Sequence, residues 1–175
     1  MDYRDIFIWY LKCAFMENTF EELKEEHMKC PFSIAQLFLR FSLGIGFLLP
    51  VLDRTGYFGI PGAPNVIWGD WTSFAGYTQQ LMPYLSLGIA SYFGFAATVL
   101  EIVFALMLIA GYKTRYAAMG SFALTLIFAL SMMLFIHVRA PFNFSVFTLS
   151  FSSLLLASFS KFPWSLDAYL NARPD

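Results

Sequence analysis

Four long apolar runs alternate with short polar connections along the chain. The runs cover about residues 34–52, 85–110, 116–138 and 142–159, and each is within or slightly beyond the ~17–25 residues that cross a bilayer as a helix. They are apolar on all sides, whereas the strands of a membrane barrel alternate apolar and polar residues over segments of ~10 residues. The pattern therefore predicts an all-α integral membrane protein, a four-helix bundle.

The connection between the first two runs, over residues 53–83, is long and rich in aromatic side chains. Turn signals recur in it, such as Pro61-Gly62, so it is not expected to be one regular element. A disordered linker would be poor in aromatic residues, but this one contains Tyr57, Phe58, Trp68, Trp71, Phe74 and Tyr77. We expect the connection to fold back as a lid over the outer end of the bundle.

Residues 1–33 precede the first run as an N-terminal extension. Residues 5–16 are apolar but too short to span, which favours an amphipathic helix lying in the membrane interface. Thr19 and Glu22 form a capping box that begins a short acidic helix, which is either a plain surface helix or a docking element for a partner. The predicted organisation is this extension, a membrane domain over residues 34–160, and a C-terminal tail over residues 161–175.

Composition supports the membrane assignment. Hydrophobic residues make up 58% of the 175 residues and charged residues 13%, against roughly 45–50% and 25% in soluble chains. The net charge of −1 argues against nucleic acid as a partner. The lipid bilayer is thus the first expected partner.

The distribution of basic residues predicts the orientation. If the chain crosses four times, the two terminal segments and the second connection share one side of the membrane. That side has eight basic residues: Arg4, Lys12, Lys24, Lys29, Lys113, Arg115, Lys161 and Arg173. The other side has only Arg54 and Arg139. The positive-inside rule then places both termini in the cytoplasm of a bacterial-type inner membrane.

Glu101 is a carboxylate deep inside the second apolar run. An ionised carboxylate at mid-bilayer costs ~2.5–3.5 kcal/mol on insertion scales, so it must be buried, neutral or paired. Arg40, in the first run, lies at a similar depth when residues are counted from the same side, and it cannot lose its proton. We therefore predict an Arg40–Glu101 ion pair. The pair either only holds the helices in register or has a working role, as a proton path or ligand contact.

A second group of polar residues is expected to converge beneath the aromatic lid. Its members are Asp53, Arg54, Asp70, Trp71, His137 and Arg139. Ordinary interfacial anchoring would also explain Arg54 and Arg139 singly. His137 is the one side chain of the group that could exchange protons near neutral pH.

Several chemistries lack the residues they need. His137 is the only histidine near the membrane, which disfavours a haem held by two histidines and a zinc site. Cys13 and Cys30 are seventeen residues apart without a CxxC pattern and are expected to be reduced thiols. The hydroxyl residues of the fourth run most simply form interhelical hydrogen bonds. No catalytic motif, metal site or cofactor-ligand motif is visible, and whether the protein is an enzyme stays open.

Two segments carry a resemblance to a known family. LFLRFSLGIGFLLP in the first run and LEIVFALMLIAGYKTRYAAMG at the second connection resemble the DoxX family of small four-helix membrane proteins. The family pattern has an Arg, a Glu, a Gly and a Thr-Arg in this order, which here are Arg40, Glu101, Gly111, Thr114 and Arg115. The resemblance covers about residues 34–160.

The resemblance implies an accessory role in a membrane redox system. The family includes a small subunit of an archaeal thiosulfate:quinone oxidoreductase, so a quinone or another amphipathic ligand and a redox protein partner are expected, and an oligomer is compatible with this role. Two rival hypotheses are a small transporter or proton-coupled carrier that uses Glu101 as a relay, and a membrane assembly or scaffold factor that docks through its acidic extension.

Overall fold

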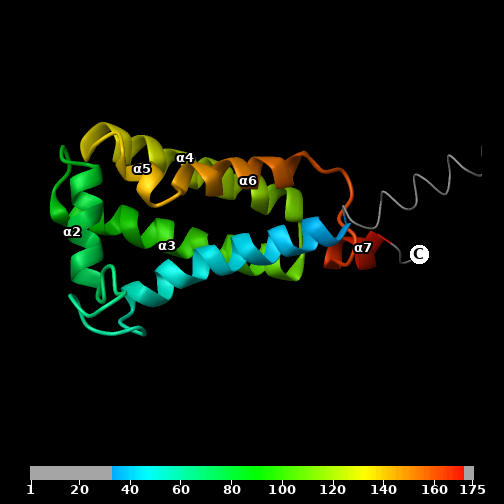
Figure 1. The fold of residues 1–175 in the computed structure, drawn as a ribbon, viewed down its shortest axis with the longest axis horizontal. Coiled ribbons are helices and arrows are strands. Elements are labelled where there is room, and N and C mark those ends of the chain that lie inside the picture. Colours follow the sequence, from blue (N-terminus) through cyan, green and yellow to red (C-terminus); the bar gives the residue numbers. More distant parts are fainter. Residues whose placement is uncertain (1–32, 172–175) are drawn as a thin grey trace, which may run out of the picture. The chain divides into compact units, whose positions relative to one another are not determined.

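The structure is a computed structural model that describes residues 33–171 (Figure 1). The chain separates into two compact units, residues 1–36 and 37–175. Of the first unit, only residues 33–36 are described, and they begin the first apolar helix. The predicted interfacial helix over residues 5–16, the capping box of Thr19 and Glu22, and both cysteines lie outside the described residues.

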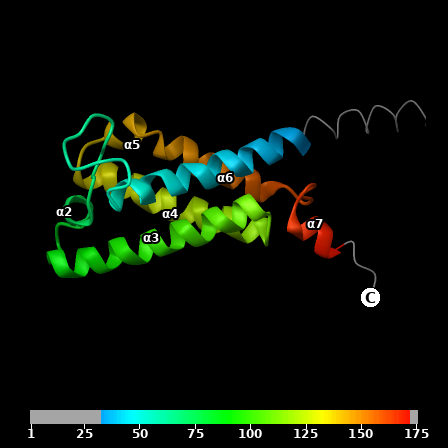
Figure 2. The ribbon, with the colours of Figure 1, turned by 90° about the horizontal axis from the view of Figure 1, so that it is seen from below.

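The described residues form helices and turns without a strand (Figures 1 and 2). The helices are Ser33–Arg54, α2 (Trp71–Leu81), α3 (Leu87–Ala110), α4 (Thr114–Phe135), α5 (Ala140–Asn143), α6 (Val146–Ser158) and α7 (Leu166–Asn171). The predicted all-α class is confirmed for this part of the chain.

Three of these helices are long and apolar enough to cross a membrane: Ser33–Arg54, α3 and α4. The fourth apolar run is not one continuous helix, because the chain breaks at Ser145, which adopts a left-handed conformation with φ 54°. The break separates the single turn of α5 from α6. With 13 residues, α6 is only ~20 Å long.

The first helix, α3, α4 and α6 run alternately up and down beside one another (Figures 1 and 2). Small residues bring the first helix close to its neighbours. A Cβ atom at Gly44 would meet Ile109 and the Ala105 carbonyl of α3, and one at Gly46 would lie 3.7 Å from Leu149 of α6. Such close approach is how membrane helices gain packing energy when lipid is as apolar as their side chains.

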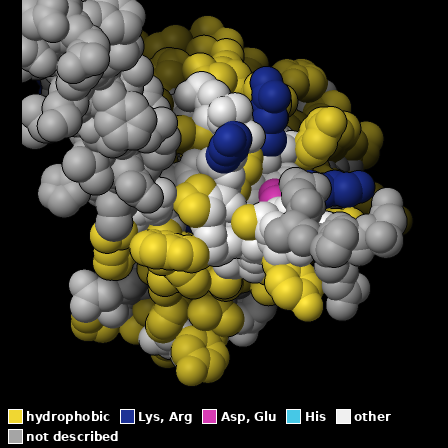
Figure 3. All heavy atoms as spheres, turned by 90° about the vertical axis from the view of Figure 1, so that its right-hand side faces the viewer, with side chains coloured by type: hydrophobic (Ala, Val, Ile, Leu, Met, Phe, Trp, Pro, Cys, Tyr) yellow, Lys and Arg dark blue, Asp and Glu magenta, His cyan; other side chains and the backbone are white. Residues whose placement is uncertain are grey.

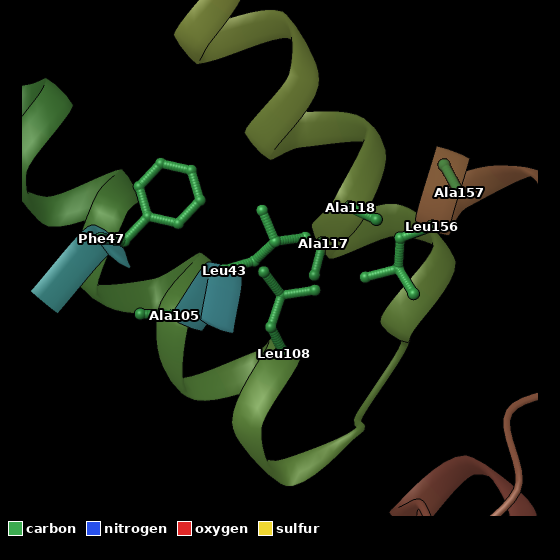
Figure 4. Packing of buried hydrophobic residues seen from close by; sticks show 8 residues of the cluster. All are labelled: Leu43, Phe47, Ala105, Leu108, Ala117, Ala118, Leu156 and Ala157. Carbon is green, nitrogen blue, oxygen red and sulfur yellow. The ribbon is translucent and has the colours of Figure 1, made fainter. Parts of the chain in front are cut away.

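A hydrophobic core packs between these helices (Figure 4). Its buried members come from the first helix, α3, α4 and α6: Leu43, Phe47, Ala105, Leu108, Ala117, Ala118, Leu156 and Ala157. Four are alanines, which let the helix backbones approach one another closely.

The long connection folds as predicted into a cover, and part of the cover is α2, a helix that was not predicted. The Asp70 carboxylate accepts from the Ser73 N–H at 2.7 Å, which caps the first turn of α2. Phe74, Ala75, Thr78 and Leu81 form the buried face of α2. A Cβ at Gly94 of α3 would lie 3.1 Å from the Phe74 ring, so α2 packs directly on α3.

The C-terminal segment is not a free tail, because α7 folds against the turn that joins α3 to α4. The Asp167 carboxylate accepts from the Lys113 N–H at 2.7 Å and from the Thr114 N–H at 2.8 Å. Asp167 in turn donates its own N–H to the Gly111 carbonyl at 2.9 Å. The first turn of α4 is therefore capped by a carboxylate from a distant part of the chain.

Candidate binding cavity and its buried ion pair

Glu101 forms a buried ion pair with Arg54. Nη1 of Arg54 lies 2.6 Å from Oε2 of Glu101, and Nη2 lies 3.3 Å from Oε1. Nη1 also donates to the Thr98 hydroxyl at 2.7 Å. Only 5% of Arg54 and 6% of Glu101 is exposed. Two parallel N–H···O contacts make this the geometrically specific kind of Arg–carboxylate pairing.

The predicted Arg40–Glu101 pair is therefore wrong, and the positions of the two arginines along the bundle explain why. In a helix every Cα–Cβ bond tilts toward the N-terminus. The first helix and α3 are antiparallel, so the side chains of Arg54 and Glu101 point toward each other along the bundle. Arg40, by contrast, lies level with the end of α3, where it binds the Leu108 and Ile109 carbonyls, and its side chain points away from Glu101. Counting residues from the start of each apolar run misjudged how far the two helices are offset along the bundle.

Arg40 instead closes the end of α3. Its Nε donates to the Leu108 carbonyl at 3.1 Å, Nη2 to the Ile109 carbonyl at 3.3 Å, and Nη1 to the Trp164 carbonyl at 3.3 Å. The last carbonyls of a helix lack partners within the helix, and a cation there also opposes the negative end of the helix dipole. Arg40 is thus a structural cap, with 1% of its surface exposed.

The Arg54–Glu101 pair lies on the wall of a cavity of ≈ 560 Å³. The first helix, α4, α6 and the cover surround it, and its rings are Phe47, Trp68, Phe74, Tyr77, Phe128 and Phe144. The volume is within the ~300–1,000 Å³ of small-molecule sites, which combine apolar walls with a few placed polar groups. Phe144 is 55% exposed, so the cavity opens to the outside beside the break between α5 and α6.

Aromatic rings hold the Arg54 guanidinium in place. Its central carbon lies 3.9 Å from the centre of the Phe74 ring and 5.2 Å from that of Trp68. The ring faces attract the cation, by ~0.5–2 kcal/mol depending on desolvation. Burial also raises the pKa of the Tyr77 phenol above its ordinary value.

The predicted outer group is dispersed, and Arg54 is its only member on the wall of this cavity. Asp53 instead anchors the cover, accepting from the Trp68 N–H at 2.8 Å and the Ile67 N–H at 3.2 Å. Asp70 caps α2, and the Ser73 N–H holds the pKa of that carboxyl below its usual value. Trp71 donates its indole N–H to the Ser91 hydroxyl of α3 at 3.1 Å.

His137 and Arg139 lie between α4 and α5 with exposed side chains, and neither lines the cavity. The expected convergence of acids, bases and an imidazole under the cover is therefore wrong. Asp53 and Asp70 are occupied in holding the cover, and the turn between α4 and α5 presents His137 and Arg139 outward.

The remaining residues of the family pattern lie where α3 ends and α4 begins, at the same end of the bundle as Arg40. Gly111 ends α3 with φ 71°, and a Cβ there would collide with Nη2 of Arg40. The side chain of Thr114 is fully buried while its N–H binds Asp167. Arg115 is exposed. Among residues 33–171, no three histidine, cysteine, aspartate or glutamate side chains gather as a metal site would require.

The hydrophobic core lies between the contacts of Arg40 and the cavity. Along the first helix, Leu43 lies between Arg40 and the cavity residues Gly46 and Phe47; along α4, Ala117 and Ala118 lie between Thr114 and the cavity residue Thr125. The core closes the cavity on the side of Arg40, which suits a binding site that is closed at one end. Sequence reasoning missed the residues of α4 and α6 on its wall, including Thr125 and Leu149, because apolar residues at helical spacing look the same whether they line a cavity or a packed core.

Comparison with known proteins gives no match: no protein-family model, no curated protein and no solved structure resembles the chain significantly.

Proposed function

We propose that this protein binds an amphipathic small molecule in the cavity beside Arg54 and Glu101, as an accessory subunit of a membrane redox system. The observation that carries the binding role is a ≈ 560 Å³ cavity with apolar walls and one buried ion pair. An amphiphile fits the apolar walls and the ion pair, since its apolar tail contacts the walls and its polar head meets the guanidinium.

The assignment to a redox system rests on the resemblance of Arg40, Glu101, Gly111 and Thr114-Arg115 to the DoxX family pattern. In the structure Arg40, Gly111 and Thr114 lie at one junction, held by Arg40's bonds to α3 and by Asp167's bonds to α4. Glu101 belongs to the separate cavity. A quinone is the ligand that this resemblance suggests, and an oxidoreductase subunit is the partner.

We further propose that α5 and α6 together complete a fourth crossing, so that both termini lie in the cytoplasm of a bacterial-type inner membrane. From Ala140 to Ser158 the two helices return the chain to the turn between α3 and α4. The Asp167 contacts with Lys113 and Thr114 place α7 at that turn.

Two glycines provide a test with a matched control. Gly76 of α2 lines the cavity, Gly88 of α3 does not, and a Cβ at either position would meet nothing within 4 Å. Gly76→Leu is therefore expected to fill the cavity without a steric clash, while Gly88→Leu adds the same side chain outside it. Native mass spectrometry of the gently extracted proteins measures what each one retains.

We expect wild type and Gly88→Leu to retain a bound amphiphile that Gly76→Leu lacks. The binding role is contradicted if wild type carries no such molecule, or if Gly76→Leu retains it equally. Chemical cross-linking in membranes, followed by identification of the partners, tests the redox role; a set of partners without an oxidoreductase subunit would contradict that part.

A further inference from the structure

The segment that follows α6 exposes apolar side chains at one end of the bundle. Its exposed residues, between 45% and 61% accessible, are Trp164, Leu166, Tyr169 and Leu170. Within α7, the last three have the i, i+3, i+4 spacing that places side chains on one face of a helix. Ala168 is exposed as well and lies on the opposite face. The helix α7 therefore has one apolar face, and that face is exposed.

Hydrogen bonds fix this segment at the turn between α3 and α4. The Asp167 N–H donates to the Gly111 carbonyl at 2.9 Å, and its carboxylate accepts from the Lys113 N–H at 2.7 Å. Before α7, the Trp164 carbonyl accepts from Nη1 of Arg40 at 3.3 Å. Because α3 and α4 are long and apolar enough to cross a membrane, the turn between them lies at one boundary of the bilayer. The helix α7 is thus held where hydrocarbon gives way to lipid headgroups.

The aromatic residues at this turn are of the kinds that membrane interfaces favour. Tyr112 is 41% exposed and Tyr116 is 75% exposed. The Lys113 ammonium lies 5.7 Å from the centre of the Tyr112 ring. Tyr and Trp are enriched at the membrane–water boundary, because their rings are apolar and carry a polar group. Trp164 and Tyr169 add the same chemistry on the segment that contains α7.

The charge of this end matches an anionic lipid surface. Three basic residues are exposed there, Lys113, Arg115 and Lys161. From α4 onward, Asp167 is the only acidic residue of the described chain, and two main-chain N–H groups bind its carboxylate. Basic side chains next to a membrane-spanning helix attract anionic headgroups. An anionic bilayer surface accounts for the apolar face, the aromatic residues and the basic residues together.

We propose that α7 is an interfacial anchor. Its apolar face inserts among the headgroups of an anionic leaflet, and the three exposed basic residues bind the lipid phosphates. The strength of such binding combines the apolar area buried with the attraction to anionic lipid. Asp167 connects the anchor to the first turn of α4, because its carboxylate binds the N–H groups there. The cavity and its ligand play no part in this role.

Spin labels on α7 test the anchor in nanodiscs of phosphatidylcholine and phosphatidylglycerol. The background is the full chain with Cys13 and Cys30 changed to serine. Leu166→Cys, Leu170→Cys and the matched control Ala168→Cys each carry one nitroxide. Oxygen concentrates in lipid and a nickel chelate in water, so power-saturation EPR distinguishes the two environments. We expect the ratio of oxygen to nickel accessibility to be several-fold higher at the two leucine positions than at the control.

Two results would overturn the anchor. If the two leucine positions are as accessible to nickel as the control, the apolar face lies in water. If they are protected from oxygen and nickel alike, protein covers the face instead of lipid.

A second measurement tests the preference for anionic lipid and leaves α7 unchanged. It compares doxyl-labelled phosphatidylglycerol and phosphatidylcholine by the fraction of each lipid that the protein immobilises. We expect wild type to immobilise more phosphatidylglycerol, and this preference to be largely lost in the triple variant Lys113→Gln, Arg115→Gln, Lys161→Gln. Equal selectivity of wild type and the triple variant would contradict the role of the basic residues. The nitroxide results do not depend on how this variant folds.

Discussion

Arg54 forms a two-point ion pair with Glu101, whereas Arg40 donates to three main-chain carbonyls. The sequence shows only two arginines and one glutamate in apolar surroundings. Residue counts gave Arg40 and Glu101 a similar depth, but the offset between two packed helices depends on their contacts. Gly44 faces Ala105 and Ile109, so Arg40 lies at the end of α3 and not beside Glu101. That Glu101 would be paired was predictable; its partner required the arrangement of the helices.

Among the residues around the Arg40 guanidinium, Gly111 is the one whose substitution should lower the stability of the protein most. Its φ of 71° suits glycine, and a Cβ would collide with the Arg40 guanidinium and approach Ser165. We expect Gly111→Ala to lower the free energy of unfolding by ~2–4 kcal/mol, from backbone strain together with weakened Arg40 bonds.

Thermal unfolding in mild detergent measures this effect. Gly88→Ala is the matched control, because its Cβ meets open space within a helix, and it should be neutral or slightly stabilising. Equal stability of the two variants would refute the proposed role of Gly111.

At the scale of elements, α2 and the break between α5 and α6 differ from what the sequence suggested. The signals for α2 were present, since Asp70 is a favourable N-cap and Phe74, Thr78 and Leu81 share a helical face. Turn residues earlier in the same connection concealed them. The break at Ser145 has no comparable signal, because an apolar run gives no indication of a single left-handed residue.

The cap that Asp167 places on α4 gives a prediction at this scale. The carboxylate binds two N–H groups of the first turn and joins α7 to it. We expect Asp167→Ala to lower the free energy of unfolding by ~1–2 kcal/mol, and Asp167→Asn to lower it less, because the amide retains one acceptor oxygen. Unfolding curves for both variants measure this, and an unchanged Asp167→Ala protein would show that α7 adds no stability.

At the scale of the whole molecule, the charge and hydrophobicity of the sequence allow its class to be predicted, but not the packing of its helices. The all-helical content followed from long apolar runs and is confirmed for the described residues, and three of their helices are long and apolar enough to cross a membrane. The cavity could not be predicted from the sequence, because it arises where the side chains of the first helix, α4, α6 and the cover leave a gap. Such a gap depends on the relative placement of segments far apart in the sequence.

Basic side chains gather at the end of the bundle where α7 lies (Figure 3), and Lys113, Arg115 and Lys161 are exposed there. In the orientation that we propose from the positive-inside rule, this end faces the cytoplasm. In a background where Cys13 and Cys30 are serine, we expect a membrane-impermeant maleimide to label Ile60→Cys on intact cells. Arg115→Cys should react only after permeabilisation, and the opposite pattern would contradict the orientation.

The most direct test of the account is a pair of double-mutant cycles on the free energy of unfolding. One cycle combines Arg54→Met with Glu101→Leu, and the other combines Arg40→Met with Glu101→Leu. Removing one partner of a buried ion pair leaves an uncompensated charge and costs ~3–5 kcal/mol, while replacing both with apolar residues is often close to neutral. We predict a coupling of ~2 kcal/mol or more between Arg54 and Glu101 and near zero between Arg40 and Glu101. Strong coupling to Arg40, with none to Arg54, would contradict the site on which the proposed function rests.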